Sequence, residues 1–368
     1  MNQIVRALQR RKPEMETQKA CCCCSSQSSP CCETNENTEP WMIGSENTPA
    51  GSIPLVSTRL TLKDRIGSWK ARWGINRMHY QIQPGLYGVG RPTPDSEVFV
   101  TANYKMSFDR LRKELNDLDG WILVLDTKGI NVWCAAGKGT FGTQELIRRI
   151  DQTSLAKIVN HKRLILPQLG AVGVAAHTVQ KATGFKVVYG PVEARDIERF
   201  LQNRYKADKS MRFVPFDLKH RLVLIPMEFV PALKFMPLFF IFTAAVHLLK
   251  GKGMTVEILW EFLPFFGALI AGSVLFQILL PWLPSRSFSL KGWLLGTGLT
   301  LFLVLLWDIP WQRQTAYFLL LPPLISYLAL NFTGSTAFTS QSGVKKELAV
   351  AVPLYLISMT GGIVFYLI

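Results

Sequence analysis

The sequence is short of the residues from which metal centres and disulfide frameworks are usually built. Only seven of its 368 residues are cysteines, and six of these fall within positions 21–32. The remaining one, Cys134, has no second cysteine nearby with the spacing of a zinc or iron–sulfur site. The odd count argues against a disulfide-stabilised secreted protein and favours a reducing compartment. The first nineteen residues are charged and polar, so they contain no signal-peptide core.

Long apolar runs are missing from the first 230 residues, whereas residues 231–368 contain little else. A helix needs about twenty apolar residues to cross the hydrocarbon core of a bilayer. Five runs approach that length, at about 232–249, 258–283, 292–307, 315–330 and 348–367. They predict an all-α transmembrane domain of about five helices. Its few ionisable residues, mainly Glu257 and Glu261, do not indicate an ion pathway.

The formal net charge of +15 is carried largely by the first 230 residues. No zinc finger, aromatic RNA-binding pattern or helix-turn-helix pattern accompanies it, so nucleic acid is not expected as a partner. The basic segment 204–230 suits a juxtamembrane linker lying against anionic headgroups. Positive charge ahead of the first span places the N-terminal part in the cytoplasm, and five spans then leave the C-terminus outside. We therefore expect a multi-pass protein of the cytoplasmic membrane.

The N-terminal residues 1–55 are polar and rich in Ser, Thr, Asn, Glu and Pro, which predicts a disordered leader. Its cysteines are either incidental or suited to a soft metal ion. Residues 56–95 place aromatic side chains between basic ones. We interpret this segment, which includes Trp69, Trp73, Tyr80 and Tyr87, as an irregular lead-in that packs on the domain that follows.

Residues 96–203 alternate between strand-like and helix-like patterns. The expected strands are 98–101, 121–126, 163–167 and 186–189, and the expected helices are 107–118, 143–150, 175–183 and 194–202. This alternation predicts an α/β domain with a parallel sheet of the Rossmann or flavodoxin-like kind. Such sheets bind ligands at the carboxyl ends of their strands. We take the domain with its lead-in to span 56–203.

The most informative segment is 129–139, which directly follows the second expected strand and contains Cys134. A buried structural cysteine and a ligand-binding thiol are both compatible with this placement. Residues 137–142 satisfy G-x-G-x-x-G, but the next strand ends without the acidic residue of a dinucleotide site. A phosphate loop would need glycine at position 132, where valine stands. None of the five histidines lies in a D-x-H-x-x-G pattern, which often supplies the lower cobalt ligand in cobalamin-dependent methyltransferases.

The run Asn-Val-Trp-Cys-Ala-Ala-Gly-Lys at 131–138 resembles the cap-helix motif of the corrinoid protein of microbial mercury methylation. Similar stretches occur at 49–51, 69–74, 84–87, 98–105 and 331–335, so the resemblance covers roughly residues 40–368. The corrinoid domain of that family is related to the large subunit of the corrinoid iron–sulfur protein. The resemblance implies a base-off corrinoid with the thiolate of Cys134 as the lower axial ligand of cobalt. It also implies that the ring contacts Thr101, Asn131, Val132, Trp133, Cys134, Ala135, Ala136, Gly137 and Lys138.

The same resemblance implies an enzyme that moves a methyl group from methyl-Co(III) corrinoid to Hg(II), giving methylmercury. A ferredoxin-like 4Fe–4S protein would reduce the cofactor, and a methylated folate or pterin system would supply the methyl group. The soft thiols of Cys21, Cys22, Cys23 and Cys24 are candidates for holding Hg(II). Two alternatives stay open: a methyl carrier of one-carbon and acetyl-CoA metabolism like the corrinoid iron–sulfur protein large subunit, and a membrane transporter with a cytoplasmic regulatory domain.

Overall fold

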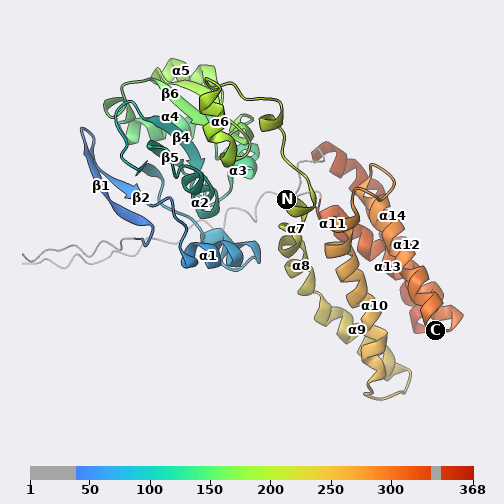
Figure 1. The fold of residues 1–368 in the computed structure, drawn as a ribbon. Coiled ribbons are helices and arrows are strands. Elements are labelled where there is room, and N and C mark those ends of the chain that lie inside the picture. The colour runs from blue at the N-terminus through green and yellow to red at the C-terminus, as the bar shows by residue number, and fades with distance from the viewer. Residues whose placement is uncertain (1–38, 333–340) are drawn as a thin grey trace, which may run out of the picture. The chain divides into compact units, whose positions relative to one another are not determined.

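The computed structural model describes residues 39–332 and 341–368, so the cysteines at 21–32 lie outside the described residues. The described part of the chain contains a seven-stranded mixed sheet with the strand order β1-β2-β3-β5-β4-β6-β7 (Figure 1). Its strands are β1 (Met42–Thr48), β2 (Gly51–Val56), β3 (Gly85–Val89), β4 (Glu97–Ala102), β5 (Gly120–Leu125), β6 (Arg163–Leu166) and β7 (Lys186–Tyr189).

The four strands expected from the sequence, β4 to β7, form the parallel half of this sheet and are confirmed. Strand β5 lies on one side of β4, and the chain then returns to place β6 on the other side of β4. The strand order therefore reverses between β4 and β6. In open α/β sheets, a crevice forms at the carboxyl ends of the strands where this reversal occurs.

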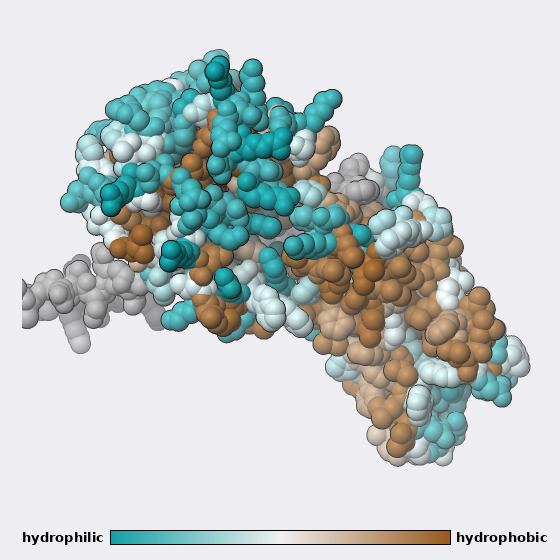
Figure 2. All heavy atoms as spheres, in the orientation of Figure 1, coloured by the Kyte–Doolittle hydropathy of each residue, from teal (hydrophilic) through white to brown (hydrophobic). Residues whose placement is uncertain are grey.

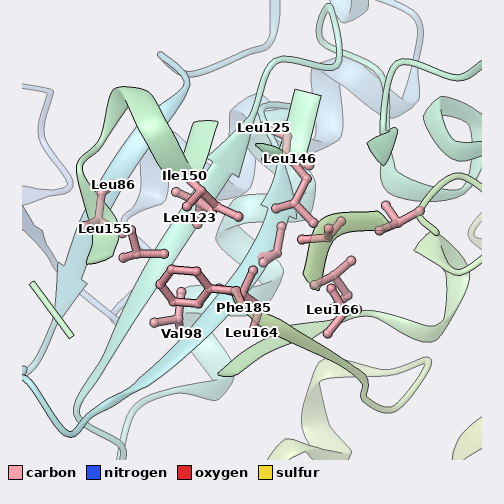
Figure 3. Close-up of a cluster of buried hydrophobic side chains, with 14 of the residues drawn as sticks. Leu86, Val98, Leu123, Leu125, Leu146, Ile150, Leu155, Leu164, Leu166 and Phe185 are labelled. Carbon is pink, nitrogen blue, oxygen red and sulfur yellow. The ribbon is translucent and has the colours of Figure 1, made fainter. Parts of the chain in front are cut away.

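Helices cover both faces of the sheet because the buried strands alternate apolar side chains toward the two sides. Residues 121, 123 and 125 of β5 pack with α3 (Val132–Lys138), α4 (Thr143–Gln152) and α5 (Ala176–Thr183) on one face. Residues 122 and 124 pack with α2 (Lys105–Glu114) and α6 (Ile197–Gln202) on the other. Figure 3 shows the first of these two cores, in which Leu123, Leu164 and Phe185 meet. Short 3₁₀ turns complete the domain at Arg77–His79, Leu155–Lys157, Gln168–Gly170, Ala194–Asp196 and Ser210–Arg212.

The structure differs from the sequence-based prediction at the N-terminal edge of this domain. Residues 42–56, which we placed in a leader reaching residue 55, form the antiparallel pair β1 and β2 and extend the sheet. Trp41 anchors the pair, because its buried ring lies against the rings of Tyr87 and Phe108. The lead-in contains the helix α1 (Leu62–Arg72) and strand β3, so it is more regular than expected.

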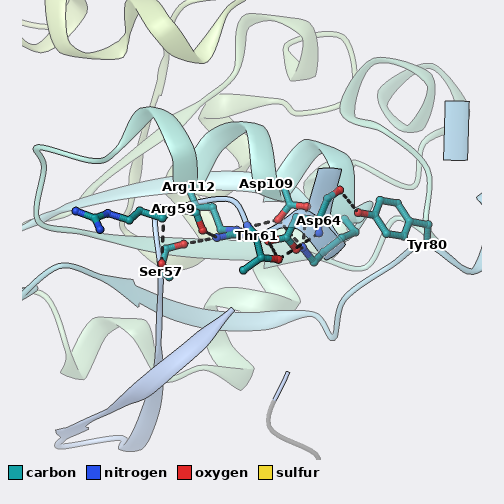
Figure 4. Close-up of polar contacts among 8 residues, drawn as sticks. Ser57, Arg59, Thr61, Asp64, Tyr80, Asp109 and Arg112 are labelled. Atoms are coloured by element: carbon teal, nitrogen blue, oxygen red, sulfur yellow. Dashed lines mark hydrogen bonds and ion pairs between the residues drawn. The ribbon is translucent and has the colours of Figure 1, made fainter. Parts of the chain in front are cut away.

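A buried ion network joins α1 to α2 (Figure 4). Asp64 accepts hydrogen bonds from Lys105 and Arg112, and the donor–acceptor distance is 2.8 Å in each. Asp109 contacts the same two cations. Burial raises the pKa of Asp64, but hydrogen bonds from Lys105 and from the Thr61 backbone outweigh that effect and lower the pKa to about 2. Asp64 is therefore ionised at every physiological pH, and its charge fixes the orientation of α1.

The C-terminal part of the chain is helical. Its elements are α7 (Leu218–Leu222), α8 (Ile225–Leu233), α9 (Met236–Leu249), α10 (Glu257–Ile270), a π-helical turn (Ala271–Leu275), α11 (Phe276–Leu279), α12 (Phe288–Leu306), α13 (Trp311–Asn331) and α14 (Gln341–Leu367). Apolar side chains dominate the surface of these helices, in contrast to the polar surface of the α/β domain (Figure 2).

Among the described residues, three helices are long and apolar enough to cross a membrane: Glu257–Leu279, Phe288–Leu306 and Gly343–Leu367. A fourth candidate is the pair Leu218–Leu233 and Met236–Leu249, which is bent by 41°. We expected about five such helices. The expected span at 315–330 is the one that is not supported by its composition. It corresponds to α13 (Trp311–Asn331), whose first turn contains the polar residues Gln312, Arg313 and Gln314.

Helix α13 tolerates this lower apolar content because its neighbours shelter it. Ten of its residues are buried, and it packs between α12 and α14. Near its start, Arg313 donates a hydrogen bond of 2.7 Å to Glu261 of α10. Glu261, one of the few ionisable residues in the apolar runs, is therefore paired, as expected for a charge inside an apolar helical bundle.

Candidate functional site

A cavity of 450 Å³ lies at the carboxyl ends of β4 and β6, where the strand order reverses. Five of the residues predicted to contact a cofactor line it together: Thr101, Asn131, Val132, Trp133 and Cys134. The first of these stands near the end of β4, and the other four open helix α3. The structure thus brings together residues that are thirty positions apart in the chain.

The thiol of Cys134 faces this cavity from the first turn of α3 and is partly exposed. The side chain of Asn131 accepts a hydrogen bond of 2.9 Å from the Cys134 backbone N–H, so it caps the helix. Ala135 and Ala136 turn the other way and are buried in the core of the domain. These two alanines position the helix without reaching the cavity.

The other two predicted residues lie away from the cavity. Gly137 and Lys138 are exposed at the end of α3, where Gly139 closes the helix in a left-handed conformation. Neither residue lines the cavity. Their place in the motif reflects the end of the helix, because a small residue and a cation are both favourable in a last turn.

The loop that leads into α3 is held by a single buried side chain, Asn103. Its Oδ1 accepts hydrogen bonds from the backbone N–H groups of Thr127 and Gly129, both at 3.0 Å, and lies 2.8 Å from the Thr127 hydroxyl. Lys128 and Gly129 adopt positive φ angles of 58° and 70°. A Cβ atom at Gly129 would also lie 3.1 Å from the Met78 carbonyl, so the turn requires glycine.

The far end of α3 is held by the loop after β6. A Cβ atom at Gly173 would lie 2.1 Å from the Phe141 carbonyl and 3.1 Å from Ala136 Cα, so only glycine allows this close approach. Phe141 itself is fully buried in the core. Helix α3 is therefore fixed at both ends, and the position of the Cys134 sulfur is set by the fold rather than by a flexible loop.

Several lining residues were missed by the sequence analysis. Pro167 and Leu169 follow β6, Gly190 and Pro191 follow β7, and Arg110 projects from α2. The first four could have been found, because each stands just beyond the carboxyl end of an expected parallel strand. Arg110 carried no such signal, since its helix was recognised only by its apolar face.

The cavity suits a large, mostly apolar ligand. Its walls are mainly apolar, with charged groups at Arg77, Arg110 and Glu193. In the described part of the chain, no three His, Cys, Asp or Glu side chains are grouped to hold a metal ion by themselves. The imidazole that also lines the cavity, His220, already contacts Glu193 and Asp217 through its two nitrogens. Two lining residues, Cys134 and Met227, carry a soft sulfur atom, and of these Cys134 is the one that can supply a thiolate.

Comparison with known proteins agrees with this geometry. Residues 76–201 match the family model of the CO dehydrogenase/acetyl-CoA synthase delta subunit. The gamma subunit of the acetyl-CoA decarbonylase/synthase complex from Archaeoglobus fulgidus is 31% identical over 131 residues, which are 35% of this chain and 27% of that protein. The corrinoid/iron–sulfur protein large subunit of Moorella thermoacetica is 28% identical over 122 residues, 33% of this chain and 27% of that protein.

The similarity is confined to the α/β domain, and the chain spans about a quarter of the length of these relatives. The matched residues begin at the 3₁₀ turn before β3 and end in α6, so they include the cavity and helix α3. The helical part of the chain lies outside them. Over residues 76–201, the chain thus carries a domain similar to the large subunit of the corrinoid/iron–sulfur protein.

Proposed function

We propose that this protein binds a corrinoid in the cavity at the carboxyl ends of β4 and β6 and transfers its methyl group to Hg(II). The observation that carries the proposal is the partly exposed residue Cys134, which lines the cavity from a helix fixed at both ends. A corrinoid held there would supply a cobalt-bound methyl group, and electron donation from the thiolate of Cys134 would make that group more carbanion-like. Hg(II) is a soft electrophile and suits such a group.

The protein's own residues would divide the remaining work. Cys134 would hold the cofactor through its sulfur, as the resemblance implies. Asn131 and Asn103 would keep that sulfur in place by capping α3 and bracing its loop. Pro167, Leu169 and Pro191 would form an apolar wall that excludes water. Thr101, which is buried at the end of β4, would contact the ring edge.

The reaction needs two partners besides Hg(II). Transfer of a methyl carbanion equivalent leaves the cofactor two electrons short of the state that accepts the next methyl cation. A ferredoxin-like 4Fe–4S protein is the class of donor that would return them, since the described residues hold no cysteine cluster of their own. A methylated folate or pterin system would supply the methyl cation. Both donors are cytoplasmic, which requires the α/β domain to face that side of the membrane.

A second function is supported by the comparisons. The similar proteins are subunits of acetyl-CoA decarbonylase/synthase complexes and of a corrinoid/iron–sulfur protein, which favours a methyl carrier of one-carbon metabolism. A carrier passes a methyl cation to a nucleophile and has no need of an electron-rich axial ligand. The two functions therefore differ in what Cys134 must do.

The test is a single set of variants in the full chain loaded with a cobalamin. Cys134→Ala should change the visible spectrum of the bound cofactor and abolish methylmercury formation. The matched control replaces Cys21, Cys22, Cys23 and Cys24 with serine, which should leave both measurements unchanged if the leader thiols are incidental. Wild-type methylmercury formation by Cys134→Ala would refute the ligand role. Bound corrinoid without methylmercury formation in the unaltered protein would favour the carrier.

A further inference from the structure

Helix α1 turns its apolar side chains away from the protein. Leu62, Ile66, Trp69 and Trp73 are 75%, 48%, 70% and 46% exposed, respectively. At 3.6 residues per turn, these four positions lie on one narrow stripe of the helix. Two more exposed apolar side chains, Ile75 and Met78, continue the patch beyond the end of the helix. The lead-in packs on the domain as expected through β3 and through Asp64 of α1, whereas this stripe does not take part in that packing.

The face of α1 that does pack on the domain is the opposite one, and it is held by charge. Asp64 and Ala71 are buried on it, and Asp64 bonds to Lys105 and Arg112 of α2. The hydroxyl of Tyr80 donates a hydrogen bond of 3.3 Å to the Asp64 carbonyl. This attachment is specific and buried, so the outward direction of the apolar stripe follows from the fold (Figure 4).

Basic residues border the stripe on both sides. Lys63 and Lys70 follow one edge of it, and Arg65 and Arg72 follow the other. Lys63, Arg65 and Lys70 are exposed and form no ion pair with any described residue. Within residues 62–79 the one acidic side chain is Asp64, which points inward. The exposed surface of α1 is thus apolar along its middle and positive along both margins.

We propose that α1 is an in-plane membrane helix that inserts Leu62, Ile66, Trp69 and Trp73 into the interface of an anionic bilayer. Helices that lie in the interface combine an apolar stripe containing tryptophan with basic residues that meet anionic headgroups. The same chain contains at least three helices apolar enough to cross a bilayer, so a lipid surface is always within reach of α1. This inference is independent of the reaction at Cys134.

A bilayer fits this surface better than a soluble protein does. The core of a protein interface is depleted in lysine, whereas Lys63 and Lys70 run along the whole stripe. Residues 1–38 fit it poorly as well, because their five basic and four acidic residues give them little net charge with which to match the basic margins. Exposed tryptophan side chains bordered by cations are what the headgroup region of a membrane accommodates.

The experiment places the photoreactive residue benzoylphenylalanine in the full chain by the substitution Ile66→benzoylphenylalanine. The protein is reconstituted in vesicles of phosphatidylcholine mixed with phosphatidylglycerol, and the adducts are identified by mass spectrometry. We expect lipid adducts on the peptide containing α1. The matched control is Val172→benzoylphenylalanine, at a position that is 84% exposed in the loop after β6 and should give few lipid adducts.

The contribution of charge is measured in the same system. The pair Lys63→Gln and Lys70→Gln should reduce the lipid adduct yield about fivefold or more, because each basic residue near an anionic surface strengthens binding by about that factor. The pair Lys181→Gln and Lys186→Gln removes the same charge elsewhere and should leave the yield unchanged. Adducts to another protein, adducts to another segment of this chain, or a lipid yield no higher than at Val172 would each overturn the proposal.

Discussion

Replacing Asn103 with alanine should loosen the loop that carries Cys134 without unfolding the domain. In the intact protein, Asn103 Oδ1 accepts hydrogen bonds from two buried backbone N–H groups, those of Thr127 and Gly129. Alanine leaves both donors without an acceptor. Asn103 is 3% exposed, so water does not replace the lost acceptor unless the loop opens.

The size of the effect follows from these two donors. A buried donor without a partner costs about 1–3 kcal/mol, so two of them cost about 2–6 kcal/mol in a rigid loop. Partial opening toward water reduces this to the lower end, about 2–3 kcal/mol. Opening of the loop should therefore become about 30- to 100-fold more frequent, since each 1.4 kcal/mol is a factor of ten.

Amide hydrogen exchange measures this opening directly. The peptide covering residues 126–134 should exchange about 30- to 100-fold faster in Asn103→Ala, whereas peptides from β4 and β5 should be unchanged. The matched control is Asn116→Ala, an exposed asparagine whose loss should cost less than about 0.5 kcal/mol. Equal exchange of residues 126–134 in the variant and the intact protein would refute the role of Asn103 as the brace of this loop.

Two further predictions concern the remainder of the chain. Because the pKa of Asp64 is lowered to about 2, its ion pairs contribute about 2 kcal/mol to the free energy of unfolding, which is complete above about pH 4 and is lost as the pH falls toward 2. The melting temperature of the intact protein should therefore fall more steeply between about pH 4 and pH 2 than that of Asp64→Asn. Parallel pH profiles of the two proteins would contradict this. An alkaline phosphatase fused after Ile368 should be active, because we expect α13, which packs between α12 and α14, to cross as a fifth pass and leave the C-terminus outside; fluorescence of a reporter that folds only in the cytoplasm would instead indicate that α13 does not cross.

The parallel half of the sheet could be predicted because its strands are buried on both faces and therefore appear as continuous apolar runs. The hairpin of β1 and β2 could not, since β1 is mostly polar, β2 is interrupted by Pro54, and the pair is anchored by Trp41 reaching Tyr87 and Phe108, which are far away in the chain. Helix α1 was missed for a related reason. Its inward face is held by Asp64 rather than by apolar residues, so its pattern is the reverse of the usual one.

The candidate site was predictable where its residues adjoin an expected strand, as Thr101 and Cys134 do. The role of Asn103 was not, because a single asparagine carries no spacing signal and its three contacts lie more than twenty positions further along the chain. Helix α13 departs from the expected composition of a span for a third reason. Length and hydropathy do not reveal that α13 is sheltered by its neighbours, and its polar start becomes understandable only once Arg313 meets Glu261.

The order of the elements along the chain also bears on how the protein is made. The last strand of the sheet, β7, ends at Tyr189, and the first helix of the apolar region begins at Leu218. The roughly 150 residues that follow take about 8 to 30 s to synthesise at about 5–20 residues per second. Mixed α/β domains of this size fold within about a second or less. The nascent α/β domain therefore has time to complete its sheet and close its cavity before the last helix leaves the ribosome, so cofactor loading need not wait for assembly of the helical bundle.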